Sequence, residues 1–279
     1  MPVKIFTDSG SDFSRDEAAK LGIEIIPVYI VYGDQRLRDG VDIDIPTFNL
    51  RREAGEHATT DPASVDDYKA AFSKAVEAGS DVVMISLSSA ISKSCERART
   101  AAAEFPGRVF VFDSKGASGL ESLFAQLAVE CANAGDSAEA IAKRLASTKY
   151  AIYFAVPDMS ALGRGGRIPK AVIALGSMLN VSLVLKMNDK GEVTPAAQSF
   201  AFEKTCDIMV EAIVRAVEHS PRARFAIAHV ESPGVAKNLS RLLETKLGHP
   251  PVQETVRESA LTIATHLGKG AVGIYAIVP

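Results

Sequence analysis

The sequence has no tryptophan, only three cysteines, no long hydrophobic run and almost no excess of charge of either sign. Its 31 lysines and arginines stand against 34 aspartates and glutamates, which gives a formal net charge of −3. Because there is no basic surplus to neutralise phosphates, we expect no nucleic-acid partner. No apolar run approaches the ~18 residues that a membrane span needs, so we expect a chain that is not transmembrane.

The three cysteines are Cys95, Cys131 and Cys206, which lie far apart and form no Cys-x-x-Cys pair. This spacing gives no indication of a disulfide framework, a zinc site or a redox centre. The simplest interpretation is that all three are small side chains in a reducing compartment. The start of the chain also lacks the regions of a signal peptide, and we therefore predict a cytoplasmic protein.

What the sequence does contain is the ordinary mixture of a folded protein, with 47% hydrophobic and 23% charged residues. This composition excludes a disordered or collagen-like chain. At ~150 residues per domain, the chain has room for one large domain or two ordinary ones.

Short apolar strands alternate with helices in the first half of the chain. Strands are predicted at Val3–Thr7, Glu24–Val31, Asp81–Ser86 and Arg108–Phe112. Helices are predicted between Ser14 and Gly22 and at Ser64–Ala78, Ser92–Glu104, Ala117–Asn133 and Asp136–Ser147. The polar stretch Tyr32–Asp44 carries turn residues. Apolar strands joined through helices indicate a parallel sheet with helices on both faces, an α/β/α arrangement.

The pattern changes after about residue 150. Strands are predicted at Ala151–Val156, Ser182–Met187, Glu192–Ala197, Arg224–Val230, Val252–Val256 and Ala271–Val278. Helices are predicted at Pro157–Leu162, Lys170–Met178, Phe202–Glu218 and Val235–Leu247. Asn188-Asp189-Lys190-Gly191 marks a hairpin, which indicates a mixed sheet. We therefore predict two α/β domains, residues 1–155 and 156–279.

Hydroxyl and carboxyl side chains gather where several predicted strands end. Three clusters follow strands and a fourth precedes a helix: Thr7–Asp12, Ser86–Ser92, Asp113–Gly116 and Thr59–Ser64. One such cluster alone is ordinarily a helix cap. Since ligands of open parallel sheets bind at the carboxyl ends of the strands, four clusters on one rim indicate a site for a carboxylate or a phosphate.

Motifs for catalysis or cofactors are missing or lack their structural context. Gly268–Gly273 fits G-x-G-x-x-G, but no helix follows it, so the dinucleotide interpretation fails. No Gly-x-Ser-x-Gly elbow occurs, and the five histidines include no i, i+4 pair. We therefore predict no catalytic residues, no metal site and no cofactor.

Several short segments match motifs of one known family in their order and spacing. They are Thr7–Phe13, Gly22–Val28, Tyr32–Asp34, Arg38–Ile43, Thr59–Pro62, Ser88–Ser92, Arg164–Ile168 and His266–Gly273. With them the chain resembles, from end to end, the DegV family of bacterial fatty-acid-binding proteins. The resemblance implies a two-domain fold, with a parallel-sheet α/β/α domain followed by an α/β domain that has a mixed sheet.

The resemblance also implies a function and a set of ligand-binding residues. One long-chain fatty acid would lie between the domains, with its carboxylate against hydroxyls and a histidine: Thr59, Thr60, Ser89, Ser92 and His266. Some relatives are subunits of a fatty acid kinase and present the bound acid to a separate ATP-dependent kinase. Such a protein then carries the acyl phosphate onward.

One departure from the family concerns the surface that meets the kinase. Relatives carry Arg-x-Arg after the second-domain hairpin, whereas this chain has Phe200-Ala201-Phe202. The change leaves open another partner, a partner with a hydrophobic patch, or no kinase. Arg167 and Lys170 remain as cations that could bind a partner, or that simply lie in a solvated loop.

Three hypotheses follow from the sequence. The first is a carrier of long-chain acyl groups without catalytic machinery of its own. The second is a stand-alone enzyme for a small acyl or phosphoryl substrate that uses His266 with one of the rim serines. The third is a regulator whose domains close on a ligand. A long apolar cavity favours the carrier, and a short polar cleft favours the enzyme.

Overall fold

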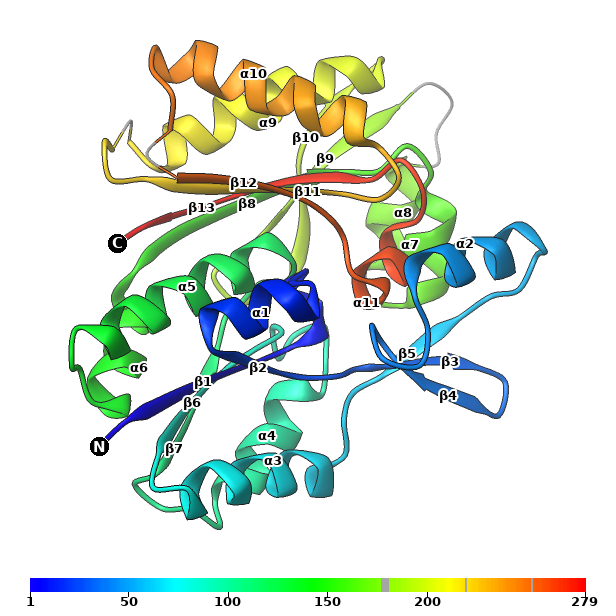
Figure 1. The fold of residues 1–279 in the computed structure, drawn as a ribbon. Helices are drawn as coiled ribbons and strands as arrows, with labels where there is room; N and C mark the ends of the chain where they lie inside the picture. The colour runs from blue at the N-terminus through cyan, green and yellow to red at the C-terminus, as the bar shows by residue number, and fades with distance from the viewer. Residues whose placement is uncertain (177–180, 219, 252) are drawn as a thin grey trace.

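Two β-sheets lie one above the other, and helix α5 (Gly119–Asn133) is packed between them (Figure 1). The computed structural model describes residues 1–176, 181–218, 220–251 and 253–279. In this part of the chain, no helix is long and apolar enough to cross a bilayer.

The first sheet is parallel throughout, with the strand order β2-β1-β6-β7. Its strands are β1 (Val3–Asp8), β2 (Ile23–Ile26), β6 (Asp81–Ser86) and β7 (Val109–Asp113). The helices around it are α1 (Arg15–Leu21), α3 (Val65–Glu77), α4 (Ser94–Ala102), α5 and α6 (Ala138–Ser147). Helices α3 and α4 cover one face, and α5 packs on the other (Figure 1). This confirms the predicted parallel sheet, and β6 is buried along its whole length as a central strand of such a sheet should be.

A small antiparallel sheet, with the order β4-β3-β5, lies beside the first sheet. Its strands are β3 (Tyr29–Tyr32), β4 (Gln35–Arg38) and β5 (Thr59–Asp61). The prediction of one strand over Glu24–Val31 was wrong, because the chain leaves β2 at Pro27 and enters another sheet as β3. Proline has no N–H for a ladder hydrogen bond, which accounts for the break. Helix α2 (Ile45–Glu53), capped by Asp44, follows.

The second sheet is mixed, with the order β10-β9-β8-β13-β11-β12. Its strands are β8 (Lys149–Ala155), β9 (Ser182–Met187), β10 (Val193–Ser199), β11 (Arg224–His229), β12 (Gln253–Glu258) and β13 (Val272–Val278). Only β11 and β12 pair in parallel among the described strands of this sheet. The predicted hairpin is confirmed as β9 and β10.

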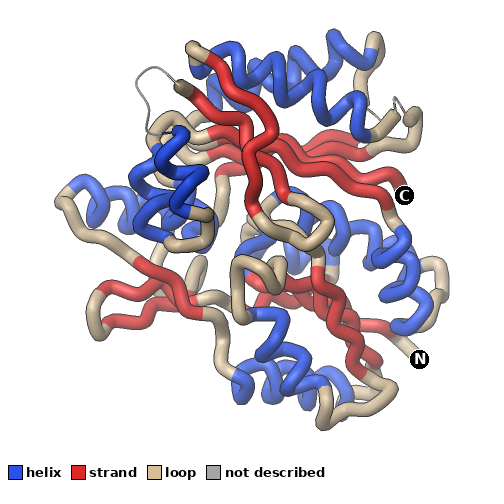
Figure 2. Tube along the Cα trace, turned by 180° about the vertical axis from the view of Figure 1, so that it is seen from behind, coloured by secondary structure: helices blue, strands red, loops and turns tan. Residues whose placement is uncertain are grey.

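Helices α9 (Phe202–Ala216) and α10 (Pro233–Leu247) cover the outer face of the second sheet (Figure 1). Three short helices lie near one end of the second sheet: α7 (Met159–Gly165), α8 (Lys170–Gly176) and α11 (Leu261–Leu267). Seen from behind in Figure 2, they lie near the small sheet. The predicted end of the helix at Met178 and the predicted start of a strand at Val252 fall outside the described residues.

The two sheets share one hydrophobic core. Its buried side chains come from the first sheet, from α5 and from the second sheet, for example Ile5, Phe124 and Tyr275. The expected domain boundary at residue 155 coincides with the end of β8, which pairs within the second sheet. The division into two domains therefore stays a prediction. The site is positioned by the hydrophobic core that the two sheets share.

Candidate ligand-binding site

A cavity of about 800 Å³ lies between the rim of the first sheet and the inner face of the second, and we call it the main cavity. Its walls are mostly apolar side chains from both halves of the chain, such as Val28, Leu87, Ala117, Ile152, Phe154 and Tyr275. The rim of the first sheet thus forms this space only together with the second sheet.

The polar side chains of the main cavity include Thr60, Ser92, Arg167 and His266. Thr60 comes from β5, Ser92 precedes α4, Arg167 follows α7, and His266 lies in α11. The Thr60 hydroxyl and the His266 Nε2 atom are 2.8 Å apart and form a hydrogen bond. Residues separated by 206 positions are thereby joined in the wall of a mostly apolar cavity.

His266 is neutral at pH 7. Burial, and after it the nearby Arg167 guanidinium, lowers the imidazole pKa to about 4. Its second nitrogen, Nδ1, is buried and has no hydrogen-bond partner in the described part of the chain. A side chain at Gly165 would meet Nδ1 at 2.5 Å from its Cβ, so the imidazole lies directly against the glycine backbone.

Two of the predicted carboxylate ligands lie outside the main cavity. Thr59 precedes Thr60 on β5 and is exposed, because successive side chains of a strand point to opposite faces. It lines a neighbouring cavity instead. Ser89 is also exposed, and its hydroxyl donates to Asp113 Oδ2 at 2.5 Å.

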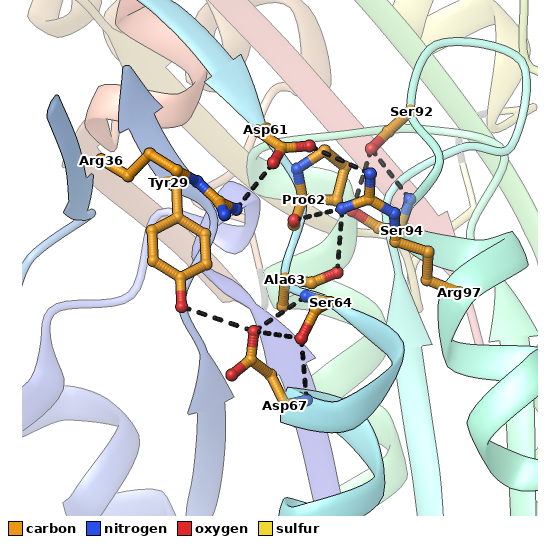
Figure 3. Close-up of polar contacts among 10 residues, drawn as sticks. All are labelled: Tyr29, Arg36, Asp61, Pro62, Ala63, Ser64, Asp67, Ser92, Ser94 and Arg97. Atoms are coloured by element: carbon orange, nitrogen blue, oxygen red, sulfur yellow. Dashed lines mark hydrogen bonds and ion pairs between the residues drawn. The ribbon is translucent and has the colours of Figure 1, made fainter. Parts of the chain in front are cut away.

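Ser92 is held by its own loop. Its hydroxyl oxygen accepts from the backbone N–H of Ser94 at 3.1 Å and lies 2.9 Å from the Ser94 hydroxyl (Figure 3). The helix predicted from Ser92 begins at Ser94, since Ser92 forms this turn ahead of it. The turn leaves the Ser92 side chain in the cavity wall.

Arg97 joins the two loops that carry Thr60 and Ser92, and its role was not predicted from the sequence. Its guanidinium pairs with Asp61 at 3.1 Å and donates to the carbonyls of Pro62 at 2.5 Å and Ala63 at 3.2 Å (Figure 3). Because Arg97 belongs to α4, these bonds fix the end of β5 against the start of α4.

Helix α11, which carries His266, is anchored by two buried carboxyls of the first half. Asp12 accepts from the backbone N–H of Ala260 at 2.9 Å. Asp39 accepts from Thr262 twice, from its N–H at 2.8 Å and its hydroxyl at 2.6 Å. Thr262 lies one turn before His266 on the same face, so this anchoring determines where the imidazole lies.

Burial raises the pKa of the carboxyls behind the site. Desolvation raises the pKa values of Asp8 and Asp12 to about 7, and it also raises those of Asp39 and Glu121. Asp8 accepts from the backbone N–H groups of Gly10 at 2.9 Å and Leu87 at 3.1 Å, which opposes the shift. These groups support loops of the rim, and Asp39, Asp12 and Asp8 are bonded to the cavity wall through Thr262, Ser118 and Leu87, in that order.

The predicted partner-binding residues differ in exposure. Arg167 is exposed yet lines the main cavity, and its guanidinium donates to the Gly165 carbonyl at 2.7 Å. Lys170 is exposed at the start of α8. Phe200 is 79% exposed, whereas Phe202 is half-buried and packs against the core beneath α9. The two aromatic side chains therefore do not form one exposed pair.

Metal chemistry has no candidate site here. Within residues 1–176, 181–218, 220–251 and 253–279, no group of three or more His, Cys, Asp or Glu side chains could hold a metal ion.

The structure defines an α/β protein in which a parallel and a mixed sheet line a mostly apolar cavity whose wall also carries hydroxyls and a histidine. The chain belongs to the DegV family, whose model, described as "Uncharacterised protein, DegV family", matches residues 2–278.

Relatives and solved structures resemble the chain over its full length. It is 30% identical to a DegV domain-containing protein of Mycobacterium tuberculosis over 280 residues, which cover 98% of this chain and 96% of the relative. It is 29% identical to a protein of Thermotoga maritima named fatty acid-binding protein over 282 residues, with coverage of 98% and 96%.

Among solved structures, a DegV family protein of Thermus thermophilus described with fatty acid binding has a TM-score of 0.91 and 29% identity, with 100% of each chain covered. DegV of Bacillus subtilis, described as a fatty acid-binding protein, has a TM-score of 0.87 and 26% identity, again with 100% of each chain covered.

Proposed function

We propose that this protein binds one long-chain fatty acid in the main cavity and acts as a carrier without catalytic machinery of its own. The observation that carries the proposal is the mostly apolar cavity whose wall includes Thr60, Ser92 and His266. The fatty-acid binding ascribed to the Thermotoga and Thermus relatives supports it.

The energetics favour the apolar walls as the main source of affinity. Each methylene group removed from water is worth ~0.8 kcal/mol, so a C16 chain offers about 12 kcal/mol before the losses of binding. Walls such as Phe154, Ile152 and Tyr275 provide that environment. The polar end then has only to supply hydrogen bonds to the carboxylate, since an unsatisfied buried charge is costly.

In our proposal Thr60 and Ser92 donate to the carboxylate, and His266 lies beside it. A neutral imidazole bonded to Thr60 fixes that hydroxyl without adding a full charge. Among the described residues that line the main cavity, Arg167 is the one that carries a full positive charge. Thr59 and Ser89, placed elsewhere, are left out of this set.

The proposal has a second part, which is that the protein presents the bound acid to a kinase. The exposed Arg167 and Lys170 support a partner surface near the cavity, and the exposed Phe200 supports a partner with a hydrophobic patch. We also place this carrier in the cytoplasm, because its three cysteines are free thiols.

The stand-alone enzyme receives one supporting observation, the hydrogen bond between a hydroxyl and a histidine. The hydroxyl is that of Thr60 rather than a rim serine, and no carboxylate in the described chain orients Nδ1 as a catalytic triad requires. The apolar walls therefore favour the carrier.

Native mass spectrometry of the purified, delipidated protein with added palmitate tests the proposal. We expect one palmitate per chain, and we expect Ala117→Phe, which fills part of the cavity wall, to abolish retention. Ala134→Phe, at the exposed end of α5, serves as the matched control and should bind as the unaltered protein does. Equal retention in both variants would show that the acid binds elsewhere.

A further inference from the structure

Four carboxyl groups are buried together at the rim of the first sheet, and we call them the carboxyl cluster. They are Asp8 in β1, Asp12 after the 3-10 helix η1 (Ser9–Ser11), Asp39 between β4 and α2, and Glu121 in the first turn of α5. None of the four is more than 6% exposed. Burial is the main cause of their raised pKa values, and repulsion adds to it, since Asp39 raises the pKa of Asp8 and Asp12, and these two raise that of Glu121. The four groups therefore lie within electrostatic reach of one another.

Hydrogen bonds join the cluster to the wall of the main cavity. Asp39 accepts from the N–H of Thr262 at 2.8 Å and from its hydroxyl at 2.6 Å. Asp12 accepts from the hydroxyl of Ser118. Both donors line the main cavity, and Thr262 lies one turn before His266 in α11. One layer of residues thus separates these carboxyls from the space that we assign to the ligand.

Glu121 has nothing beside it that would stabilise a negative charge. Both of its carboxyl oxygens are buried and have no hydrogen-bond partner among the described residues. The ionisable groups that face it would all repel a carboxylate: Asp8, Asp12, Asp113 and Cys95. Because an unpaired buried charge costs much more than a buried neutral group, we expect Glu121 to keep its proton at neutral pH.

Two cations near the cluster are paired with other carboxylates. Arg257 faces Asp12, but its guanidinium pairs with Glu17 at 3.2 Å. Lys115 pairs with Asp113 at 2.9 Å. The phenols that face the cluster are neutral, because burial raises their pKa: Tyr68 and Tyr275. Neighbouring carboxyls with so little positive charge cannot all ionise in a low-dielectric interior, so the cluster retains protons near neutral pH.

Asp8 and Asp12 change their protonation in the range where the protein works if it is an ordinary bacterial carrier. Burial, the largest cause, raises the pKa of each to about 7. Near such a pKa, a small change in the local charge alters the fraction of molecules that carry the proton.

We propose that the carboxyl cluster links protons to ligand binding, so that a carboxylate entering the main cavity draws a proton into the cluster and binds more tightly as the pH falls. An added negative charge beside the cluster favours its protonated form, and by linkage the protonated cluster favours the ligand. The inference rests on the proposed function, because it needs an anionic ligand in the main cavity.

Isothermal titration calorimetry of palmitate in two buffers of different ionisation enthalpy, phosphate and Tris, counts the protons taken up with the ligand. Asp12→Asn is the main variant, and Asp39→Asn is the second. Asparagine does not ionise, yet its carbonyl oxygen still accepts a hydrogen bond from Ser118 or Thr262. Asp34→Asn, in the exposed turn between β3 and β4, makes the same chemical change outside the cluster and is the matched control.

We expect the unaltered protein and Asp34→Asn to take up about 0.2–0.5 proton per palmitate near neutral pH. Their affinity should fall about three- to tenfold between about pH 6 and about pH 8, since the slope of log affinity against pH equals the uptake with opposite sign. Asp12→Asn and Asp39→Asn should each take up about half as much or less, with a correspondingly flatter pH dependence.

The proposal is overturned if the unaltered protein binds palmitate without proton uptake. It is also overturned if both cluster variants take up as much as the unaltered protein, because the proton then goes to His266 or to the ligand itself. Failure of palmitate to bind overturns the proposed function and the linkage with it, whereas binding without uptake overturns the linkage alone.

Infrared spectroscopy tests the protons of the cluster without any ligand. At about pH 8 the unaltered protein should show the C=O stretching band of a protonated, buried carboxyl group, and Glu121→Gln should lose it. If the unaltered protein shows no such band, the cluster does not retain protons and the proposal fails.

Discussion

At the scale of single residues, Ser92 and Ser89 make a matched pair. Both belong to the same serine-rich loop, but only Ser92 lines the main cavity. We expect Ser92→Ala to weaken palmitate binding roughly tenfold, because a hydrogen bond to a charged group is worth about 1.5 kcal/mol or more. Ser89→Ala should leave the affinity, measured by calorimetry, within about twofold. Equal effects of the two changes would remove Ser92 from the carboxylate site.

The protonation of His266 is a second property of one residue. Because burial and Arg167 lower its pKa to about 4, the ring should stay neutral well below the usual pKa of histidine. NMR of the ring nitrogens between about pH 7.5 and pH 5.5 should show no titration of His266. A midpoint near 6.5 for His266 would contradict the buried, neutral imidazole.

The sequence predicted which segments carry candidate site residues. It did not distinguish the side chains in those segments that line the main cavity from those that do not. The motifs brought Thr60, Ser92 and His266 into one hypothesis, and the structure places all three around the main cavity. Thr59 was included because adjacent threonines look alike in a sequence, although a strand sends them to opposite faces. Arg97 was missed because its role depends on carbonyls 34 and 35 positions away in the chain.

At the scale of elements, helix α11 has little local support. It has only seven residues, and its N-terminal cap carries no side-chain hydrogen bond of its own. A helix this short is marginal in isolation. Asp12 and Asp39 supply the missing acceptors from more than 220 positions away. No periodicity within residues 261–267 could have revealed this helix, and the sequence analysis did not predict it.

Other elements show where local patterns are sufficient. The hairpin of β9 and β10 was predicted correctly from its turn residues. The helix predicted at Ser64–Ala78 is α3, which begins directly after its cap, Ser64. Helix α2 was missed although its signals, Asp44 as cap and Pro46 in the first turn, are local. The surrounding polar stretch obscured them.

Thr262→Val tests the anchoring of α11. The change removes the hydroxyl that donates to Asp39 at 2.6 Å but keeps the size of the side chain. We expect the free energy of unfolding to fall by about 1–3 kcal/mol in urea titrations, because a buried carboxyl loses a donor. Thr265→Val is the control, since its hydroxyl only donates to the Leu261 carbonyl within the same helix. A loss no larger than that of the control would show that Asp39 does not anchor the helix.

At the scale of the whole molecule, the buried acids make stability depend on pH. Burial raises the pKa values of Asp8 and Asp12 to about 7 from an unfolded value near 3.8. The stabilisation from such groups is complete below the unfolded pKa and is lost as pH rises through the folded pKa. We therefore expect the free energy of unfolding to fall as the pH rises from about 5 to about 8, because the stabilisation from Asp8 and Asp12 is lost.

Asp12→Asn separates this effect from that of the surface charges. Urea titrations across this pH range should show a smaller decrease for the variant than for the unaltered protein, because asparagine does not ionise. His266 acts in the opposite direction, since its lowered pKa favours folding at higher pH, and its contribution should be the same in both proteins. Identical pH profiles would show that Asp12 is not a buried acid with a raised pKa.

The central claim is that the space between the two sheets holds an acyl chain. A crystal structure of the protein grown with palmitate tests it most directly. We predict continuous density for the chain against Phe154 and Tyr275, with the carboxylate within hydrogen-bond distance of Thr60 and Ser92. A main cavity that contains only water or a short polar molecule, with palmitate elsewhere or unbound, would contradict the account.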